Sequence, residues 1–309
     1  MRSEIEAAAR LIREGQLVAF PTETVYGVGA SALDEQAVNR IYEAKRRPSN
    51  SPLIVHVCSI DMARGLVREW PDAAARLATQ FWPGPLTLVL PKSKHVPDRV
   101  TAGLDTVGIR MPDHPLALDL IRTAGLPIAA PSANLFSELS PTTAGHVRSG
   151  LGDRVAMVLD GGPTRVGIES TVLSLAGPEP VLLRPGMISQ ADIENVIGPV
   201  RVHTAASIQD AHPSPGLHRK HYSPRTRLVL VDNGALPAAG RGAYIWFTTP
   251  AAADRVIRMP ADPHACAAIL YDTLHQLDGL ALDWIAVERP PSGIMWAGIM
   301  DRLERASAR

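Results

Sequence analysis

Short apolar segments alternate with segments of helical spacing over the first two hundred residues, and this alternation restricts the fold more than any other feature. The apolar or β-branched segments are bounded by proline and glycine and predict strands at 17–20, 53–57, 86–90, 107–110, 155–160, 170–175 and 181–184. The segments between them predict helices at 34–46, 60–69, 72–81, 113–124, 141–149 and 189–197. Strands that alternate with helices form a sheet covered by helices, so we expect an α/β domain with a largely buried sheet.

The pattern changes near residue 200. Residues 204–226 contain many turn-forming residues and no apolar period, which predicts a linker or a functional loop. Beyond them, strands are expected at 228–231, 243–247 and 284–288, with helices at about 263–278 and 293–306. The 309 residues therefore divide into a first domain (1–203), a linker (204–226) and a smaller α/β domain (227–309).

Charge and cysteine content exclude several classes of protein. Lysine and arginine together number 31, as do aspartate and glutamate, so no overall charge attracts nucleic acid or an anionic membrane, and any phosphate site must be local. Two cysteines are too few for a disulfide framework or a four-cysteine zinc site. The first residues include acidic ones and lack the apolar core of a signal peptide, so we expect none, and no apolar run reaches the roughly 18 residues of a transmembrane helix. We expect a cytoplasmic protein.

Several of the predicted strands adjoin polar residues that suit an anionic ligand. A Thr-Glu-Thr turn that ends at Thr24 follows the first strand, and Lys45 and Arg47 precede the second. A lysine point charge and an arginine fork can grip phosphates, although cations at a helix end also complement its dipole. Arg110 ends an apolar strand with no carboxylate nearby in sequence, so either a distant acidic residue or a ligand carboxylate pairs with it.

Further polar residues adjoin strands or apolar runs, and each has a structural alternative. His56 lies among apolar residues, as a core histidine does. Ser132 and Asn134 follow an apolar run in a turn, where they can contact a nucleotide or satisfy the backbone. Ser170 and Arg184 again lie next to strands. Together these residues predict one polar, cationic face that suits an anionic small molecule.

Other known motifs fit less well. Residues 27–32 match the letters of a dinucleotide-binding fingerprint, but six residues separate them from the preceding strand, whereas the fingerprint needs its turn directly after the strand. His212, His218 and His221 of the linker do not have the spacing of a zinc site, and we expect no metal held by the protein itself.

In combination, the motifs closely resemble the YrdC-like domain of threonylcarbamoyl-AMP synthases. They occur in the same order and spacing: PTETVYGVGA, Lys45-Arg46-Arg47-Pro48 with PLIVHV, WPGPLTLVL, VGIRMPDHP, Ser132-Ala133-Asn134, SPTTA, IESTV and LLRPG. The linker SPGLHRKHYSP and the ending VERPPSGIMWAGIMDRLERA resemble the longer, two-domain form of the family. Ser51 and Arg46 depart from the asparagine and glycine usual at these positions, and GLHRKHY departs from the usual GMKYRHY.

The resemblance implies a fold and an activity. The fold would be a twisted mixed sheet with a concave cationic face, a small Rossmann-like C-terminal domain, and a linker that folds over the site. The activity would be synthesis of L-threonylcarbamoyl-adenylate from L-threonine, bicarbonate and ATP with release of pyrophosphate, the first step toward threonylcarbamoyladenosine in tRNA. Mg²⁺ would arrive with ATP rather than in a protein cage, and a tRNA threonylcarbamoyl transferase complex would receive the product. No stable binding of nucleic acid or membrane is implied.

The resemblance also assigns roles to individual residues. Those implied in catalysis are Lys45, Arg47 and Ser132. Those implied in threonine binding are Thr24, His56, Arg110, Ser132 and Ser170, with Arg110 on the carboxylate. Those implied in ATP binding are Arg47, Ser51, Thr106, Asn134, Thr142, Arg184 and Tyr222.

Three other functions remain as alternatives. An RNA-binding module would use the cationic face, but the chain has no net charge and no aromatic residues interleaved with basic ones. A carbamoyl-adenylate-forming transferase with a related domain would carry additional zinc-binding cysteines. An ATP hydrolase would need no threonine.

Overall fold

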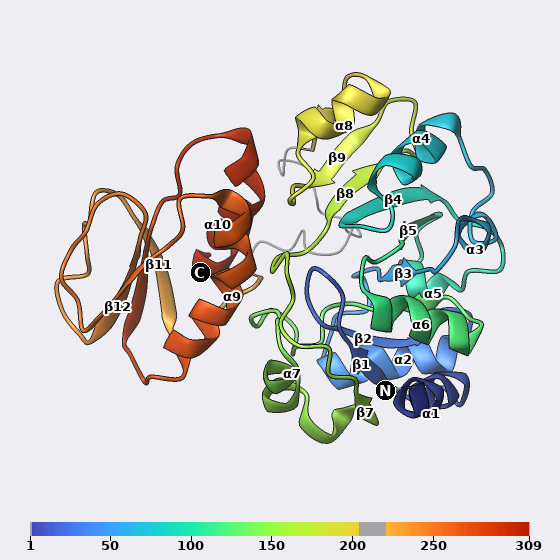
Figure 1. Ribbon diagram of the computed structural model, residues 1–309, viewed down its shortest axis with the longest axis horizontal. Coiled ribbons are helices and arrows are strands. Elements are labelled where there is room, and N and C mark those ends of the chain that lie inside the picture. Colours follow the sequence, from blue (N-terminus) through green and yellow to red (C-terminus); the bar gives the residue numbers. More distant parts are fainter. Residues whose placement is uncertain (1, 204–220, 309) are drawn as a thin grey trace.

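The computed structural model describes residues 2–203 and 221–308, which form two sheets with their helices (Figure 1). The first domain contains the strands β1 (Val18–Phe20), β2 (Gly27–Ser31), β3 (Ile54–His56), β4 (Leu86–Pro91), β5 (Thr106–Arg110), β6 (Ile128–Ala129), β7 (Met157–Val158), β8 (Thr171–Ser174), β9 (Val181–Arg184) and β10 (Arg201–Val202). Its helices are α1 (Arg2–Arg13), α2 (Glu35–Lys45), α3 (Ile60–Arg64), α4 (Asp72–Phe81), α5 (Asp98–Thr101), α6 (Pro115–Ala124), α7 (Ala144–Gly150) and α8 (Gln190–Ile197), with a 3-10 turn at Gly152–Arg154.

These strands form one mixed sheet in the order β10-β9-β8-β4-β5-β3-β6-β2-β1-β7. β3 and β5 are parallel, and their register places His56 beside Arg110. β4 is antiparallel to β5 and parallel to β8, while β9 is antiparallel to β8. The beginning of β8 and the ends of β5 and β9 therefore lie at one edge of the sheet.

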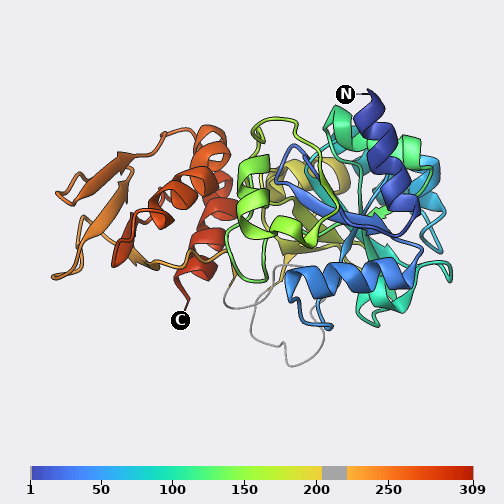
Figure 2. The same cartoon turned by 90° about the horizontal axis from the view of Figure 1, so that it is seen from below.

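Alternating side chains of the strands are buried under helices on both faces of this sheet. Val18 and Phe20 of β1 pack with apolar residues of α1 and α6, whereas Ala19 packs in the cluster that includes α2. Because successive strand residues point to opposite faces, β1 is covered on both sides. Figure 2 shows α1 and α2 on opposite sides of the sheet.

The second domain is a parallel sheet with two main helices. Its elements are β11 (Arg227–Val231), β12 (Gly242–Trp246), β13 (Arg255–Arg258), α9 (Pro263–Asp278), β14 (Trp284–Glu288), a 3-10 turn at Ile294–Trp296 and α10 (Ala297–Ser307). The strand order is β11-β14-β12-β13, with every pair parallel. Figures 1 and 2 show α9 and α10 between this small sheet and the first domain.

The predicted fold class is confirmed: a large mixed sheet is joined to a second, smaller α/β domain. Sequence reasoning missed β2, β6, β10 and β13. β2 contains two glycines, and a Cβ on Gly29 would lie 2.6 Å from a methyl carbon of Ile128, so close packing requires glycine there and hides the strand signal. The domain boundaries stay predictions, and most of the linker, including His212 and His218, lies outside the described residues. Within the described ranges, no helix is long and apolar enough to cross a membrane.

Candidate active site

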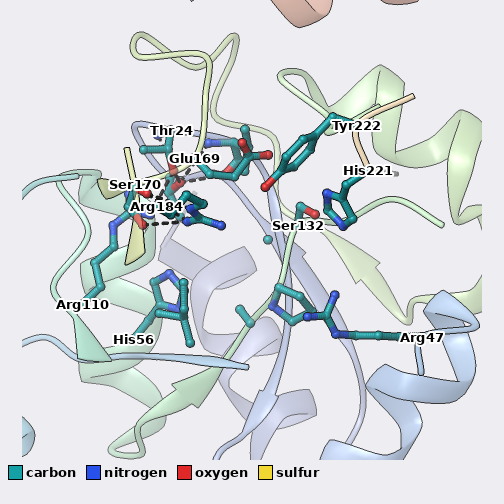
Figure 3. Close-up of a pocket in the computed structure, with 16 residues that line it drawn as sticks. Thr24, Arg47, His56, Arg110, Ser132, Glu169, Ser170, Arg184, His221 and Tyr222 are labelled. Atoms are coloured by element: carbon teal, nitrogen blue, oxygen red, sulfur yellow. Dashed lines mark hydrogen bonds between the residues drawn. The ribbon is translucent and has the colours of Figure 1, made fainter. Parts of the chain in front are cut away.

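A pocket lies over the first sheet, beside the edge where β5 and β9 end (Figure 3). Its lining combines cationic, hydroxyl and apolar residues: Thr22, Thr24, Val25, Gly27, Arg47, Ile54, His56, Arg110, Ala130, Pro131, Ser132, Glu169, Ser170, Arg184, His221 and Tyr222. Figure 3 shows Arg110 and His56 on one side and Tyr222 and His221 on the other. The topology therefore unites segments that are far apart in the sequence.

Arg110 is held by three groups of its own domain. Its Nε donates to the carbonyl of Gly84 at 3.2 Å, and its Nη1 donates to Thr24 Oγ1 at 3.0 Å. Its Nη2 lies 2.6 Å from Oε2 of Glu23, a fully buried carboxylate. The sequence left open whether a distant acidic residue or a ligand carboxylate pairs with Arg110, and the structure shows an acidic residue, Glu23. Sequence reasoning quoted the Thr-Glu-Thr turn but did not single out Glu23, because only the fold brings it to β5.

His56 is buried beside Arg110 and is uncharged at neutral pH. Burial, and then the positive charge of Arg110, lower the pKa of its imidazole to about 3. Its Nδ1 is buried without a hydrogen-bond partner among the described residues. A neutral imidazole has one ring nitrogen that donates a hydrogen bond and one that accepts, so which of the two His56 offers to a ligand depends on its tautomer.

Arg184 is fixed against the start of β8. Its Nε and Nη2 donate to the carbonyl of Ser170 at 3.1 and 3.0 Å, and Nη2 also donates to Ser170 Oγ at 3.2 Å. Ser170 Oγ in turn lies 2.8 Å from Thr87 Oγ1. Burial lowers the pKa of Arg184 from its usual value, but an arginine remains charged in a protein. The network thus holds a cation at one wall of the pocket.

Arg47 supplies a further cation from the loop after α2. Its Nε and Nη2 donate to the carbonyls of Ser51 at 3.2 Å and Pro52 at 3.1 Å, and its guanidinium lies over the Phe136 ring. Burial lowers its pKa to about 10, so it stays protonated at neutral pH.

Lys45 lies outside the pocket lining. Its Nζ donates to the carbonyls of Ser132 at 2.5 Å and Asn134 at 2.6 Å, so it fixes the loop that carries Ser132 into the pocket. Burial, followed by the charge of Arg47, lowers the pKa of Lys45 well below its usual range.

The other residues implied in nucleotide binding also lie outside this lining, apart from Tyr222. The Ser51 carbonyl accepts hydrogen bonds from Tyr42 and Arg47, and the Asn134 amide donates to the carbonyls of Leu135 and Glu138. Thr142 contacts His146. Thr106 begins the strand that Arg110 ends, which separates the two by about 13 Å.

Tyr222, from the end of the linker, forms the opposite wall. It is buried in a left-handed backbone conformation, with φ 59°. Its ring packs edge-on against His221 and over the guanidinium of Arg302, a residue of α10. Its hydroxyl has no hydrogen-bond partner among the residues the structure describes. A tyrosine with an unused hydroxyl in the wall can contact a ligand.

Glu169 in the pocket lining and Arg302 behind it were not found from the sequence. Glu169 lines the pocket and accepts hydrogen bonds from Ser140 Oγ at 2.5 Å, Tyr271 Oη at 3.1 Å and Arg302 Nε at 2.8 Å. Burial raises the pKa of Glu169, but the neighbouring charges of Arg302 and Arg184 lower it by more, so Glu169 is ionised. Glu169 stands in the IESTV motif, but no local pattern indicates that Tyr271 and Arg302, two of its partners, lie in the second domain.

The fold and pocket are those of an α/β protein with a candidate site for anionic small molecules. Cations and neutral hydrogen-bonding groups dominate the lining, and this composition suits the positioning of phosphates and carboxylates.

Comparison with known proteins gives the family. A Sua5–YciO–YrdC family model, described as "Telomere recombination", matches residues 10–186, and the model "Threonylcarbamoyl-AMP synthase, C-terminal domain" matches residues 188–308. A threonylcarbamoyl-AMP synthase of Bacillus subtilis is 47% identical over 98% of this chain and 93% of its own, and one of Pyrococcus abyssi is 43% identical over 98% and 94%. The structure of P. abyssi Sua5 complexed with L-threonine superposes with a TM-score of 0.93, at 42% identity over 99% of this chain and 95% of that one. The chain therefore belongs to the threonylcarbamoyl-AMP synthase family, and the resemblance seen in the motifs is confirmed.

Proposed function

We propose that this protein makes L-threonylcarbamoyl-AMP and pyrophosphate from L-threonine, bicarbonate and ATP. One observation carries the proposal: Thr24, His56, Arg110 and Ser170 line the same pocket as Arg47 and Arg184. This places candidate groups for an amino acid next to candidate groups for phosphates. The full-length relationship to synthases, one of them solved with L-threonine, supports the same substrates.

Threonine would bind on the side of Arg110. An arginine carries five N–H donors, and Gly84, Thr24 and Glu23 engage its three nitrogens from within the protein. The remaining donors would hold the amino-acid carboxylate, with Thr24 and Ser170 hydroxyls and the neutral His56 around the rest of the molecule. Glu23 fixes the direction in which the guanidinium points.

The nucleotide would bind across Arg47 and Arg184. Threonine's amine would form a carbamate, either by adding carbon dioxide with loss of a proton or by reacting with bicarbonate with loss of water. A carbamate oxygen would then attack the α-phosphate in line while pyrophosphate leaves. The protein's part in such a reaction is to hold the reactants together and stabilise developing negative charge. In this proposal Ser132 lies where threonine and ATP meet, and Lys45 holds its loop. Tyr222 would contact the nucleotide from the linker side.

Mg²⁺ would enter with ATP. Glu169 lines the pocket and is engaged by Arg302, and Glu23 lies behind the lining and is engaged by Arg110. These residues fit a metal bound to ATP phosphates better than one held by the protein. An acyl-adenylate product is reactive and needs a group-transfer enzyme to consume it, and a tRNA threonylcarbamoyl transferase complex remains the proposed acceptor. The cytoplasmic location stays a prediction.

Pyrophosphate release by the full chain tests the proposal. The reaction is run with ATP, threonine and bicarbonate together, then without threonine, and then without bicarbonate. We expect pyrophosphate to be released only when threonine and bicarbonate are both present. Release without threonine would replace the proposal with an ATP hydrolase, and no release from folded protein would favour a binding module.

A further inference from the structure

Arg302 extends from the second domain to the wall of the pocket. It is 1% exposed, and its Nε donates to Glu169 Oε2 at 2.8 Å. Its Nη2 donates to the carbonyl of Glu169 at 3.2 Å, and its Nη1 donates to the carbonyl of Pro185 at 3.0 Å. The guanidinium of Arg302 therefore contacts Glu169, which precedes Ser170 in the sequence, and Pro185, which follows Arg184.

Close backbone packing holds the two domains together at the same place. A Cβ on Gly298 of α10 would lie 3.0 Å from the Cα of Gly186, and a Cβ on Gly167 would lie 2.1 Å from the carbonyl of Ala267 in α9. Gly167 and Gly186 flank the two segments that Arg302 contacts. The position of Arg302 is therefore set by helix backbone rather than by a flexible loop.

The charges around Glu169 explain why an arginine is needed there. Glu169 lines the pocket together with Arg47 and Arg184. An uncompensated carboxylate in a buried wall would repel the phosphates of ATP and would attract Arg184 away from them. Arg302 also contacts Asp301, but Asp301 is shared with Arg305, which lies 2.9 Å away.

We propose that the second domain completes the nucleotide site, with Arg302 as a positioning residue that offsets the charge of Glu169 and leaves Arg184 directed at the phosphates. This inference rests on the proposed function. Threonine is a zwitterion and ATP is a polyanion, so loss of the offset affects ATP more than threonine. The domain then contributes a charge to the site as well as support for the linker.

The test compares R302M with the double variant R302M/E169Q in the full chain. Affinity for ATP is measured by calorimetry and as the ATP KM of pyrophosphate release, and affinity for threonine by calorimetry. We expect R302M to weaken ATP binding at least tenfold and threonine binding less than threefold. Removal of the opposing charge in R302M/E169Q restores most of the ATP affinity, which a purely structural role of Arg302 would not allow.

A matched control separates this effect from loss of stability. Glu288 of β14 accepts hydrogen bonds from the backbone of residues 247–249 and does not line the pocket. E288Q lowers the melting temperature of the same domain and leaves the ATP KM within twofold. If R302M does not fold, the E169Q variant tests the proposal by itself. We expect E169Q to bind ATP at least twofold more tightly than the wild type does.

Three results would overturn the proposal: an ATP KM for R302M within twofold of the wild type, no recovery of ATP affinity in the double variant, or ATP binding by E169Q that is less than twofold tighter than that of the wild type. The failure of the proposed function is a separate result. It would appear in the wild-type protein as pyrophosphate release that does not depend on threonine and bicarbonate.

Discussion

Two buried pairs of glutamate and arginine flank the pocket, and they face it in opposite orientations. In the Glu23–Arg110 pair, the arginine lines the pocket and the glutamate lies behind it. In the Glu169–Arg302 pair, the glutamate lines the pocket and the arginine lies behind it, on the other domain. The first pair presents a cation whose direction is set by its acid, and the second presents an acid whose charge is offset.

This difference indicates that function accounts for both pairs better than stability does. A buried ion pair often stabilises a fold no more than apolar residues of similar size, although removal of one partner is costly. The first pair can direct Arg110 at an amino-acid carboxylate, and the second can keep the pocket wall from repelling a nucleotide. The variants below break or sharpen this comparison.

Arg110→Met breaks the first pair and has the largest expected effect. It leaves Glu23 buried without its partner, so we expect a loss of about 3–5 kcal/mol of unfolding free energy and loss of threonine binding. Chemical denaturation and calorimetry measure the two effects. Arg110→Lys keeps the charge without the planar fork, so it is expected to retain the fold and lose about tenfold in threonine affinity. Threonine affinity equal to the wild type in both variants would exclude Arg110 from the site.

Lys45→Ala tests a buried cation that is held by carbonyls instead of a carboxylate. The loop that carries Ser132 would lose its anchor, and we expect turnover to fall roughly 100-fold, as when a preorganised charge is removed from an active site. Steady-state pyrophosphate release measures the loss. The matched control is Lys94→Ala, because Lys94 is exposed and lies outside the pocket. Turnover near the wild-type value would remove Lys45 from the mechanism.

The pH dependence of stability tests the environment of His56 beside Arg110. Its folded pKa of about 3 lies below the unfolded value of about 6.5, so the unfolded chain binds a proton that the folded chain does not. The contribution of neutral His56 to the unfolding free energy is therefore fully present above about pH 6.5. It falls by about 1.4 kcal/mol per pH unit as the pH is lowered toward 3. Urea denaturation between pH 7 and 5 is expected to show a shallower dependence in His56→Gln. An unchanged slope would mean that His56 takes up its proton over the same pH range in the folded and unfolded chains, and that its folded pKa is not lowered.

Arg201→Ala gives the smallest effect and sets a baseline for the buried pairs. Arg201 and Glu179 form an ion pair whose side chains are 74% and 63% exposed. Water and salt screen such a pair, so we expect a change in unfolding free energy of less than about 0.5 kcal/mol. Denaturation at low and high salt measures it. A loss as large as that of Arg110→Met would remove the distinction between exposed and buried pairs.

Local patterns were enough to predict the main elements but not the partners of the pocket residues. Apolar spacing found β3, β5 and β9, and with them placed His56 within a strand, Arg110 at the end of a strand and Arg184 next to one. The glycines of β2 gave no strand signal, because small residues there reflect close packing rather than propensity.

Long-range pairs were missed for a different reason. Glu23 meets Arg110, and Glu169 meets Arg302, only after the sheet has formed and the second domain has packed against it. The same holds for Lys45, whose ammonium contacts the loop of Ser132 instead of the pocket. A single sequence contains no spacing rule that reports contacts of this kind.

The most direct measurement of the central claim is the fate of labelled bicarbonate. The full chain is incubated with ATP, L-threonine and ¹³C-bicarbonate, and the adenylates are analysed by mass spectrometry. We expect threonylcarbamoyl-AMP that carries one ¹³C and that disappears when threonine is omitted. An adenylate without the label, or ADP as the sole nucleotide product, would contradict the account.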